Sequence, residues 1–141
     1  MSVHFRLIGT DLPGATCGPG PTESGEYISV HVGVQRGKEV IDLVRGDAAQ
    51  AVFEFDVEVR EGKFSGPYVH GSHGERFVYL SWGEVAYGHF NMFRRAKLQL
   101  DSLDPDACDG HTVEGRLGLI DPKGHPLCAS VRPPKIAWTV E

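Results

Sequence analysis

Apolar and polar residues alternate along several short stretches of the chain, which is the pattern of β-strands that bury one face. The longest example is residues 51–60, where every second position from Ala51 to Val59 is apolar and most positions between them are charged. A period of two over this length predicts a half-buried strand and not a helix. Shorter alternating or apolar stretches predict strands at 3–7, 27–35, 40–44, 77–82, 113–120, 127–131 and 135–140.

Residues 77–82 differ from the other predicted strands because both of their faces are mostly apolar (FVYLSW). A strand of this kind is covered on both sides, so we expect it in the middle of a two-layer structure. The stretch 91–103 fits two patterns. Its apolar residues from Ala96 to Leu100 alternate as in a strand, whereas residues 92, 96, 99 and 103 fall at helical spacing. We favour the strand.

Turn residues divide the chain into many short elements. The 18 glycines and 9 prolines are scattered and not repeated, and residues 10–26 form a Gly/Pro-rich loop. Hairpins are predicted at 27–44 and 113–131, and 104–110 is a turn or a single helical turn with Pro105 in its first position. We therefore expect a single β domain over 1–141, an antiparallel β-sandwich or barrel of about eight strands with at most one short helix.

The net charge limits the kinds of partner that the protein can bind, and the cysteine content indicates its cellular compartment. A formal net charge of −5 disfavours nucleic acid and anionic membranes, which both require a positive surface. No apolar run reaches the ~20 residues of a membrane helix, and residues 1–9 do not resemble a signal peptide. The three cysteines, Cys17, Cys108 and Cys128, are odd in number and far apart. This spacing favours reduced thiols in a cytoplasmic protein and leaves the oligomeric state open.

Four segments carry a family resemblance: GVQRG at 33–37, FSGPYVHGSHGERFVYLSWG at 64–83, FRRAKLQL at 93–100 and GHPLCASVRPP at 124–134. On these segments the chain resembles an uncharacterised bacterial family, one of the domains of unknown function. The resemblance implies one self-contained domain. It implies no activity, cofactor or catalytic residue.

His70 and His73 stand in an H-x-x-H spacing within a glycine-containing loop, and His89 follows in the same half of the chain. Imidazoles are common zinc ligands, so a third converging ligand would complete a metal site. No cysteine pair accompanies these histidines, which favours surface or hydrogen-bonding roles. The group supports only an alternative function, a metal-dependent or hydrolase-type enzyme.

Residues 64–97, which include this loop, also contain side chains suited to an anionic ligand. Glycines at 66, 71 and 74 let backbone N–H groups approach a ligand closely, and Arg76 follows where the next strand begins. The loop lacks the G-x-x-x-x-G-K-[ST] pattern, so it is not a P-loop. The candidate ligand-binding residues are His70, His73, Arg76, Arg94, Arg95 and Lys97.

Each basic candidate also has a structural interpretation. Arg94 shares the strand face of Ala96 and Leu98, so it points inward or lies at a rim or bulge. Arg95 and Lys97 could pair with the acidic residues 54, 56 and 58, which otherwise form a solvated face. We predict no catalytic residue, no metal and no cofactor. The favoured function is a small cytosolic non-enzymatic binding or interaction domain for an anionic small molecule or a protein partner.

Overall fold

The computed structural model describes residues 1–10, 30–45, 50–71, 74–86, 88–118 and 136–141. The predicted loop at 10–26, the predicted strand at 127–131 and its preceding turn therefore lie largely or wholly outside the described residues. Within the strands, some side chains are also outside the description, and only the backbone is described for Val30, Arg45, Trp82, Glu84, Ala86, Asn91, Phe93, Arg94 and Gly118.

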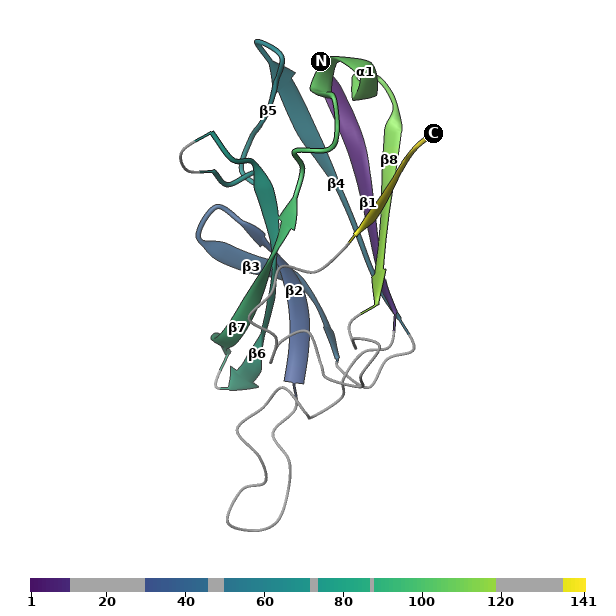
Figure 1. Cartoon of the computed structure of the whole chain (residues 1–141). Coiled ribbons are helices and arrows are strands. Elements are labelled where there is room, and N and C mark those ends of the chain that lie inside the picture. The colour runs from purple at the N-terminus through teal and green to yellow at the C-terminus, as the bar shows by residue number, and fades with distance from the viewer. Residues whose placement is uncertain (11–29, 46–49, 72–73, 87, 119–135) are drawn as a thin grey trace.

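The described chain folds into two β-sheets (Figure 1). The first has the order β5-β4-β1-β8-β9, with β1 at Ser2–Thr10, β4 at Gln50–Arg60, β5 at Lys63–Ser65, β8 at Thr112–Gly118 and β9 at Ala137–Val140. The second has the order β3-β2-β6-β7, with β2 at Val30–Arg36, β3 at Glu39–Arg45, β6 at Phe77–Ala86 and β7 at His89–Gln99. The all-β prediction is confirmed, and the described residues hold nine strands.

One core lies between the two sheets because the strands of both present their alternate apolar residues to it. The predicted alternation holds in β1 and β4, where Phe5 and Phe53 are almost fully buried. The second sheet contributes Val34, Leu80 and Leu98 to the same cluster. The ring of Phe5 stacks on a β4 ring and meets the edge of a β9 ring, so aromatic packing joins three strands.

The only helix in the described residues is one turn, α1, at Pro105–Cys108. Its side-chain cap is Asp104, which accepts a hydrogen bond from the Asp106 N–H at 3.1 Å, and proline occupies the first turn as predicted. No described helix is long and apolar enough to cross a membrane.

The turn at α1 changes the expected strand pairing. Just after α1, the Gly110 N–H donates to the Ser2 carbonyl at 2.9 Å, which brings the chain back to the start of β1. As a result β8 begins beside the beginning of β1 and runs parallel to it. The expectation of purely antiparallel pairing is therefore wrong for this pair, although the other described strand pairs are antiparallel.

β6 occupies the inner position predicted for residues 77–82, between β2 and β7. Both of its faces are buried, with Val78 and Leu80 in the core and Phe77 and Tyr79 on the opposite, outer face of the sheet. β7 pairs with it from one end to the other. Residues 91–99 are thus a strand, and the helical alternative for 91–103 is wrong.

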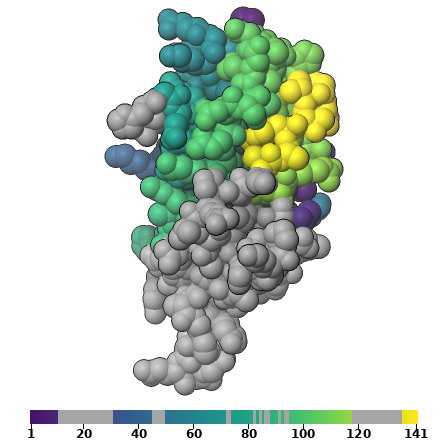
Figure 2. Space-filling model, viewed as in Figure 1, coloured from purple at the N-terminus to yellow at the C-terminus, as the bar shows by residue number. Residues whose placement is uncertain are grey.

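The edges of the two sheets meet where β9 passes β7. The indole N–H of Trp138 in β9 donates to the Gln99 carbonyl at the end of β7, at 3.1 Å. Figure 2 shows the yellow C-terminal strand packed against green residues of the same face. This contact links the two sheets on one side of the core.

The acidic stripe of β4 is paired within its own sheet. His4 of β1 contacts Asp56 at 2.9 Å and Glu54 at 3.3 Å, and Glu58 pairs with Arg60 at 3.0 Å. The suggested pairing of this stripe with residues 95 and 97 is wrong, because those residues lie in the other sheet, on its outer face. Among the described residues, no three His, Cys, Asp or Glu side chains are placed to hold a metal ion.

The turn after β4 is a two-residue hairpin that leads into the short strand β5. Arg60 pairs with Lys63, and the two residues between them have positive φ angles, 52° at Glu61 and 73° at Gly62. This combination is a type I′ turn, in which asparagine is favoured at the first position and most other side chains are strained. Glu61 is therefore a local source of strain.

We expect Glu61→Asn to raise the free energy of unfolding by about 0.5–1 kcal/mol, a gain of roughly 1–4 °C in melting temperature for a chain of this size. Thermal denaturation followed by circular dichroism measures it. Glu61→Val is the control, because a β-branched residue tolerates positive φ poorly and should lower the melting temperature. The same response from both variants would contradict the turn assignment.

Candidate functional site

The chain leaves one sheet for the other between β5 and β6, and a pocket of about 430 Å³ opens at this crossover. β5 is paired with β4 in the first sheet, whereas β6 is central in the second, so residues 66–76 must span the gap. We call this pocket the crossover pocket. Its lining is Arg60, Glu61, Lys63, Phe64, Ser65, Gly66, Val69, His70, Gly71 and Arg76.

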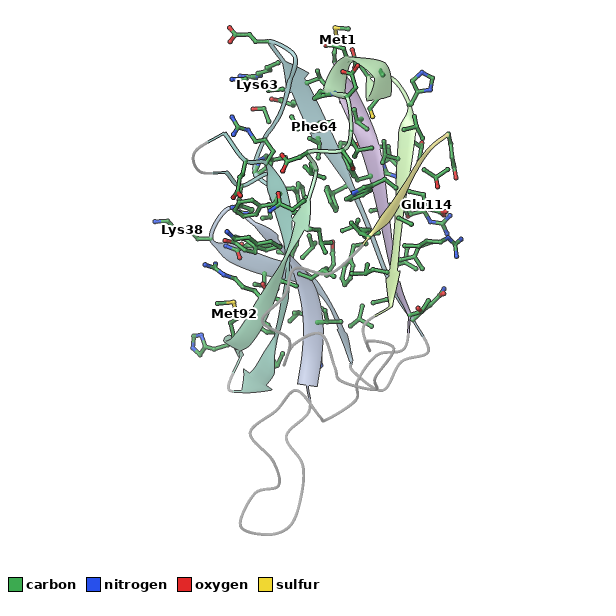
Figure 3. The ribbon with its side chains drawn as sticks, viewed as in Figure 1. Met1, Lys38, Lys63, Phe64, Met92 and Glu114 are labelled. Atoms are coloured by element: carbon green, nitrogen blue, oxygen red, sulfur yellow. The ribbon has the colours of Figure 1, made fainter. Side chains whose placement is uncertain are left out.

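Three cationic side chains and one carboxylate line the crossover pocket. Arg60 pairs at 3.0 Å with Glu58, outside the pocket lining. Lys63 is exposed and has no carboxylate partner among the described residues. In Figure 3 Lys63 and Phe64 lie together on β5, and the Phe64 ring is buried in the core. The short strand thus fixes a lysine beside the pocket while its neighbour anchors it.

Arg76 is held by the loop itself. One of its guanidinium nitrogens donates to the Glu75 carbonyl at 2.8 Å. Gly71 makes this position possible, since a Cβ there would collide with that carbonyl and lie 2.8 Å from the Arg76 nitrogen. Gly66 has a φ of 119°, which is accessible to glycine and strained for other residues. Gly71 therefore leaves room for the Glu75 carbonyl and the Arg76 side chain, whereas the predicted approach of glycine N–H groups to a ligand stays a prediction.

His70 is fixed at the edge of β6. Its backbone exchanges two hydrogen bonds of 2.9 Å with Phe77, and its ring lies against Phe77 and Tyr79. Burial lowers the pKa of the imidazole, the charge of Arg95 acts in the same direction, and a hydrogen bond to the Gln35 backbone opposes both. The Nε2 atom is buried without a hydrogen-bond partner. The neutral ring is therefore the favoured form at neutral pH.

Arg95 and Lys97 lie over aromatic rings beside His70. The Arg95 guanidinium is 4.1 Å from the centre of the Tyr79 ring, and the Lys97 ammonium is 4.5 Å from that of Phe77. These cation–π contacts hold both charges on the outer face of the second sheet. Neither residue lines the crossover pocket.

The structure thus brings two of the six predicted binding residues, His70 and Arg76, into one pocket. His73 and the side chain of Arg94 lie outside the described residues. The backbone of Arg94 pairs with Trp82 next to a shift in strand register, where a bulge was considered. Lys63 was missed because β5 is too short to produce an alternating pattern, and Arg60 was assigned only to the charged face of the strand at 51–60.

The predicted histidine group does not assemble in the described residues. His70 pairs with Phe77 at the start of β6, whereas His89 pairs with Ala86 at its end. A strand rises about 3.3 Å per residue, so these two positions lie roughly 30 Å apart along the ten residues of β6. The two histidines cannot share a metal ion or a substrate atom.

Comparison with known proteins adds a family but no activity. The family model DUF5990, described as a family of unknown function, matches residues 3–141. The chain belongs to the DUF5990 family. The predicted membership of an uncharacterised family is confirmed. No curated protein and no solved structure matches the chain. What this DUF5990 member does must therefore be argued from its residues.

We expect the two histidines at positions 4 and 70 to titrate on opposite sides of 6.5. Hydrogen bonds with Asp56 and Glu54 raise the pKa of His4 above that value, whereas burial lowers the pKa of His70. NMR titration of the imidazole signals, assigned with His4→Gln and His70→Gln, measures both. A midpoint for His70 at or above that of His4 would contradict the described burial.

The same pKa shifts predict opposite effects on stability. As pH falls below 6.5, His70 binds a proton in the unfolded chain but not in the folded protein, because its folded pKa is lower. The free energy of unfolding therefore falls with pH until the pH drops below the folded pKa of His70. As pH rises above 6.5, the stabilising charge of His4 is lost through its raised folded pKa. His70→Gln should reduce the pH dependence of the free energy of unfolding only below pH 6.5. His4→Gln should reduce it only above pH 6.5.

Proposed function

We propose that this DUF5990 protein is a small non-enzymatic binding domain that holds a small anion, such as a phosphate or a carboxylate, in the crossover pocket. The observation that carries the proposal is the meeting of Arg60, Lys63 and Arg76 around one pocket that contains a single carboxylate, Glu61. Like charges that share a small volume repel each other, and a bound anion relieves that repulsion. The cations come from two segments that fold together only at the crossover.

The size and lining of the pocket suit a small polar ligand. Its volume of about 430 Å³ lies within the range of small-molecule sites. Arginine can bind carboxylate or phosphate through two parallel hydrogen bonds, and lysine adds a point charge. Gly66 and Gly71 also line the pocket, and neither carries a side chain that would take up its volume.

The described polar groups favour binding over catalysis. Nucleophilic catalysis requires a hydroxyl or thiol activated by a neighbouring base. Ser65 and His70 line the same pocket, but no hydrogen bond joins them, because the imidazole bonds the Gln35 backbone and its Nε2 has no partner. The only described cysteine, Cys108, is buried elsewhere, and burial raises the pKa of its thiol.

We also propose that the protein is located in the cytosol of a bacterium and that its fold is an antiparallel sandwich. Three widely separated cysteines support a reducing compartment, and the bacterial setting rests on the resemblance of the four segments quoted above. The two sheets around one core support the sandwich class. A protein partner remains the second ligand class of this proposal.

We expect inorganic phosphate, pyrophosphate or citrate to raise the melting temperature of the wild-type protein at low salt. A ligand at 100 times its Kd stabilises the folded state by about 2.7 kcal/mol. Isothermal titration calorimetry should show affinity reduced about five- to tenfold in Lys63→Gln and in Arg76→Gln, because each removes one charge-assisted contact. Glu61→Gln should strengthen binding by removing the carboxylate from the pocket.

Arg116→Gln is the matched control, since Arg116 is an exposed arginine of β8 that pairs with Glu114, away from the pocket. It should bind these anions as the wild type does. The proposal fails if none of the three anions raises the wild-type melting temperature, or if Arg116→Gln loses affinity to the same extent as Lys63→Gln.

A further inference from the structure

Both edge strands of the second sheet contain a bulge. In the β2–β3 pair, Val32 pairs with Val44 and Val34 with Ile41, so two residues of β3 oppose the single residue Gly33. One of these two, Asp42, has a φ of 56°. In the β6–β7 pair, the partners of residues 82 and 83 are residues 94 and 92, so β7 contains one additional residue between them. Bulges redirect the side chains on either side of them.

The β3 bulge directs two apolar side chains across the outer face of the sheet. In a regular strand, residues three positions apart face opposite sides. Here Val40 and Leu43 both cover Gly33, with methyl carbons 2.6 and 2.8 Å from the place that a Cβ on Gly33 would take. Gly33 faces outward because Val32 and Val34 on either side of it are in the core.

The β7 bulge has the same effect at the opposite edge. Arg95 pairs with Ser81, which pairs with Gly33, so Arg95 shares that outer face. Met92 pairs with Gly83, two residues along β6 from Ser81, so it shares the face as well. Without the extra residue, Met92 and Arg95 would lie on opposite sides of the sheet.

The two bulged edges border a groove of about 550 Å³, which we call the outer groove. Leu43, Val85 and Met92 line it and are 36%, 44% and 48% exposed. They are three of the five large apolar side chains that are exposed in the described chain. Figure 3 shows Lys38 and Met92 on the side of the second sheet that faces away from the first. The outer groove shares no lining residue with the crossover pocket.

We propose that the outer groove binds a small amphipathic anion, a carboxylate carried on an alkyl chain or an aromatic ring. The apolar side chains would cover the alkyl chain or the ring of the ligand. The cations of the groove favour a ligand with a negative charge. Lys38 and Arg95 line the groove with one carboxylate, Glu39, and neither cation has an ion-pair partner among the described residues.

The position of Arg95 suits a carboxylate. Its guanidinium lies over the Tyr79 ring, and an arginine that contacts a ring in this way can still offer N–H groups to a carboxylate through two parallel hydrogen bonds. A groove of this volume matches a small molecule, whereas a stable protein interface needs on the order of 1,000 Å² of buried surface.

Decanoate is the probe for this site, used below its micelle-forming concentration and measured by isothermal titration calorimetry. With inorganic phosphate present to occupy the crossover pocket, we expect one decanoate per chain. Arg95→Gln should weaken binding about fivefold through loss of a partly exposed charge contact. Met92→Gln should weaken it by a similar factor by placing a polar group against the alkyl chain. Both side chains are exposed, so the melting temperature should stay close to that of the wild type.

Val140→Gln and Lys63→Gln are the matched controls. Val140 is an apolar residue of β9, 47% exposed, and Lys63 belongs to the crossover pocket, so neither change should alter decanoate binding. Decylammonium should not bind. The proposal is overturned if wild-type protein binds no decanoate, if decylammonium binds as tightly, or if Arg95→Gln leaves the affinity unchanged. It is equally overturned if sedimentation velocity shows a dimer that Met92→Gln dissociates, since the groove would then hold a second copy.

Discussion

Two backbone hydrogen bonds between His70 and Phe77 hold the chain at the point where it passes from one sheet to the other. They fix His70 against the start of β6, on one side of the crossover pocket. The same pair of bonds places the His70 ring on Tyr79, beside the cation of Arg95. This bridge therefore positions His70 both in the crossover pocket and against the rings of Phe77 and Tyr79.

The charged surfaces of the molecule differ in whether their charges are already matched. On the outer face of the first sheet, the acidic residues of β4 are paired with His4, Arg6 and Arg60. Exposed pairs of this kind contribute little stability, and they leave no net charge to attract a ligand. At the crossover pocket Arg60 is matched by Glu58, but Lys63 and Arg76 still exceed the single carboxylate, and in the outer groove the cations also exceed the carboxylates. This contrast, more than the presence of charge, distinguishes a candidate site from an ordinary solvated face.

Much of the fold could be predicted because it depends on a period of two. The alternation in β1, β4 and β7 predicted their buried faces correctly, and Pro105 marked the single helical turn. The parallel pairing of β1 with β8 could not be predicted in this way, since alternation shows which face is buried and not which strand lies alongside. The β3 bulge escaped detection because Asp42 belongs to no turn motif, although its φ is positive, whereas a bulge at Arg94 in β7 was one of the alternatives considered.

The candidate site was predicted in part. The loop glycines and Arg76 were identified from residue type, but Lys63 comes from a strand of three residues, which is too short to show a pattern. Arg95 and Lys97 were expected to meet an anion or the acidic stripe, and the structure places them on aromatic rings. Cation–π pairing between neighbouring strands depends on register, and register is set by tertiary packing.

The central claim is that the crossover pocket binds anions, and a backbone NMR titration with inorganic phosphate tests it most directly. The account predicts saturable ¹H–¹⁵N shift changes centred on residues 60–66, 69–71 and 74–76, which line the pocket or adjoin it, with the amides of Gly66 and Gly71 among the largest. Saturable changes centred instead on the far end of β7, or shifts that grow linearly without saturation across the whole surface, would contradict it.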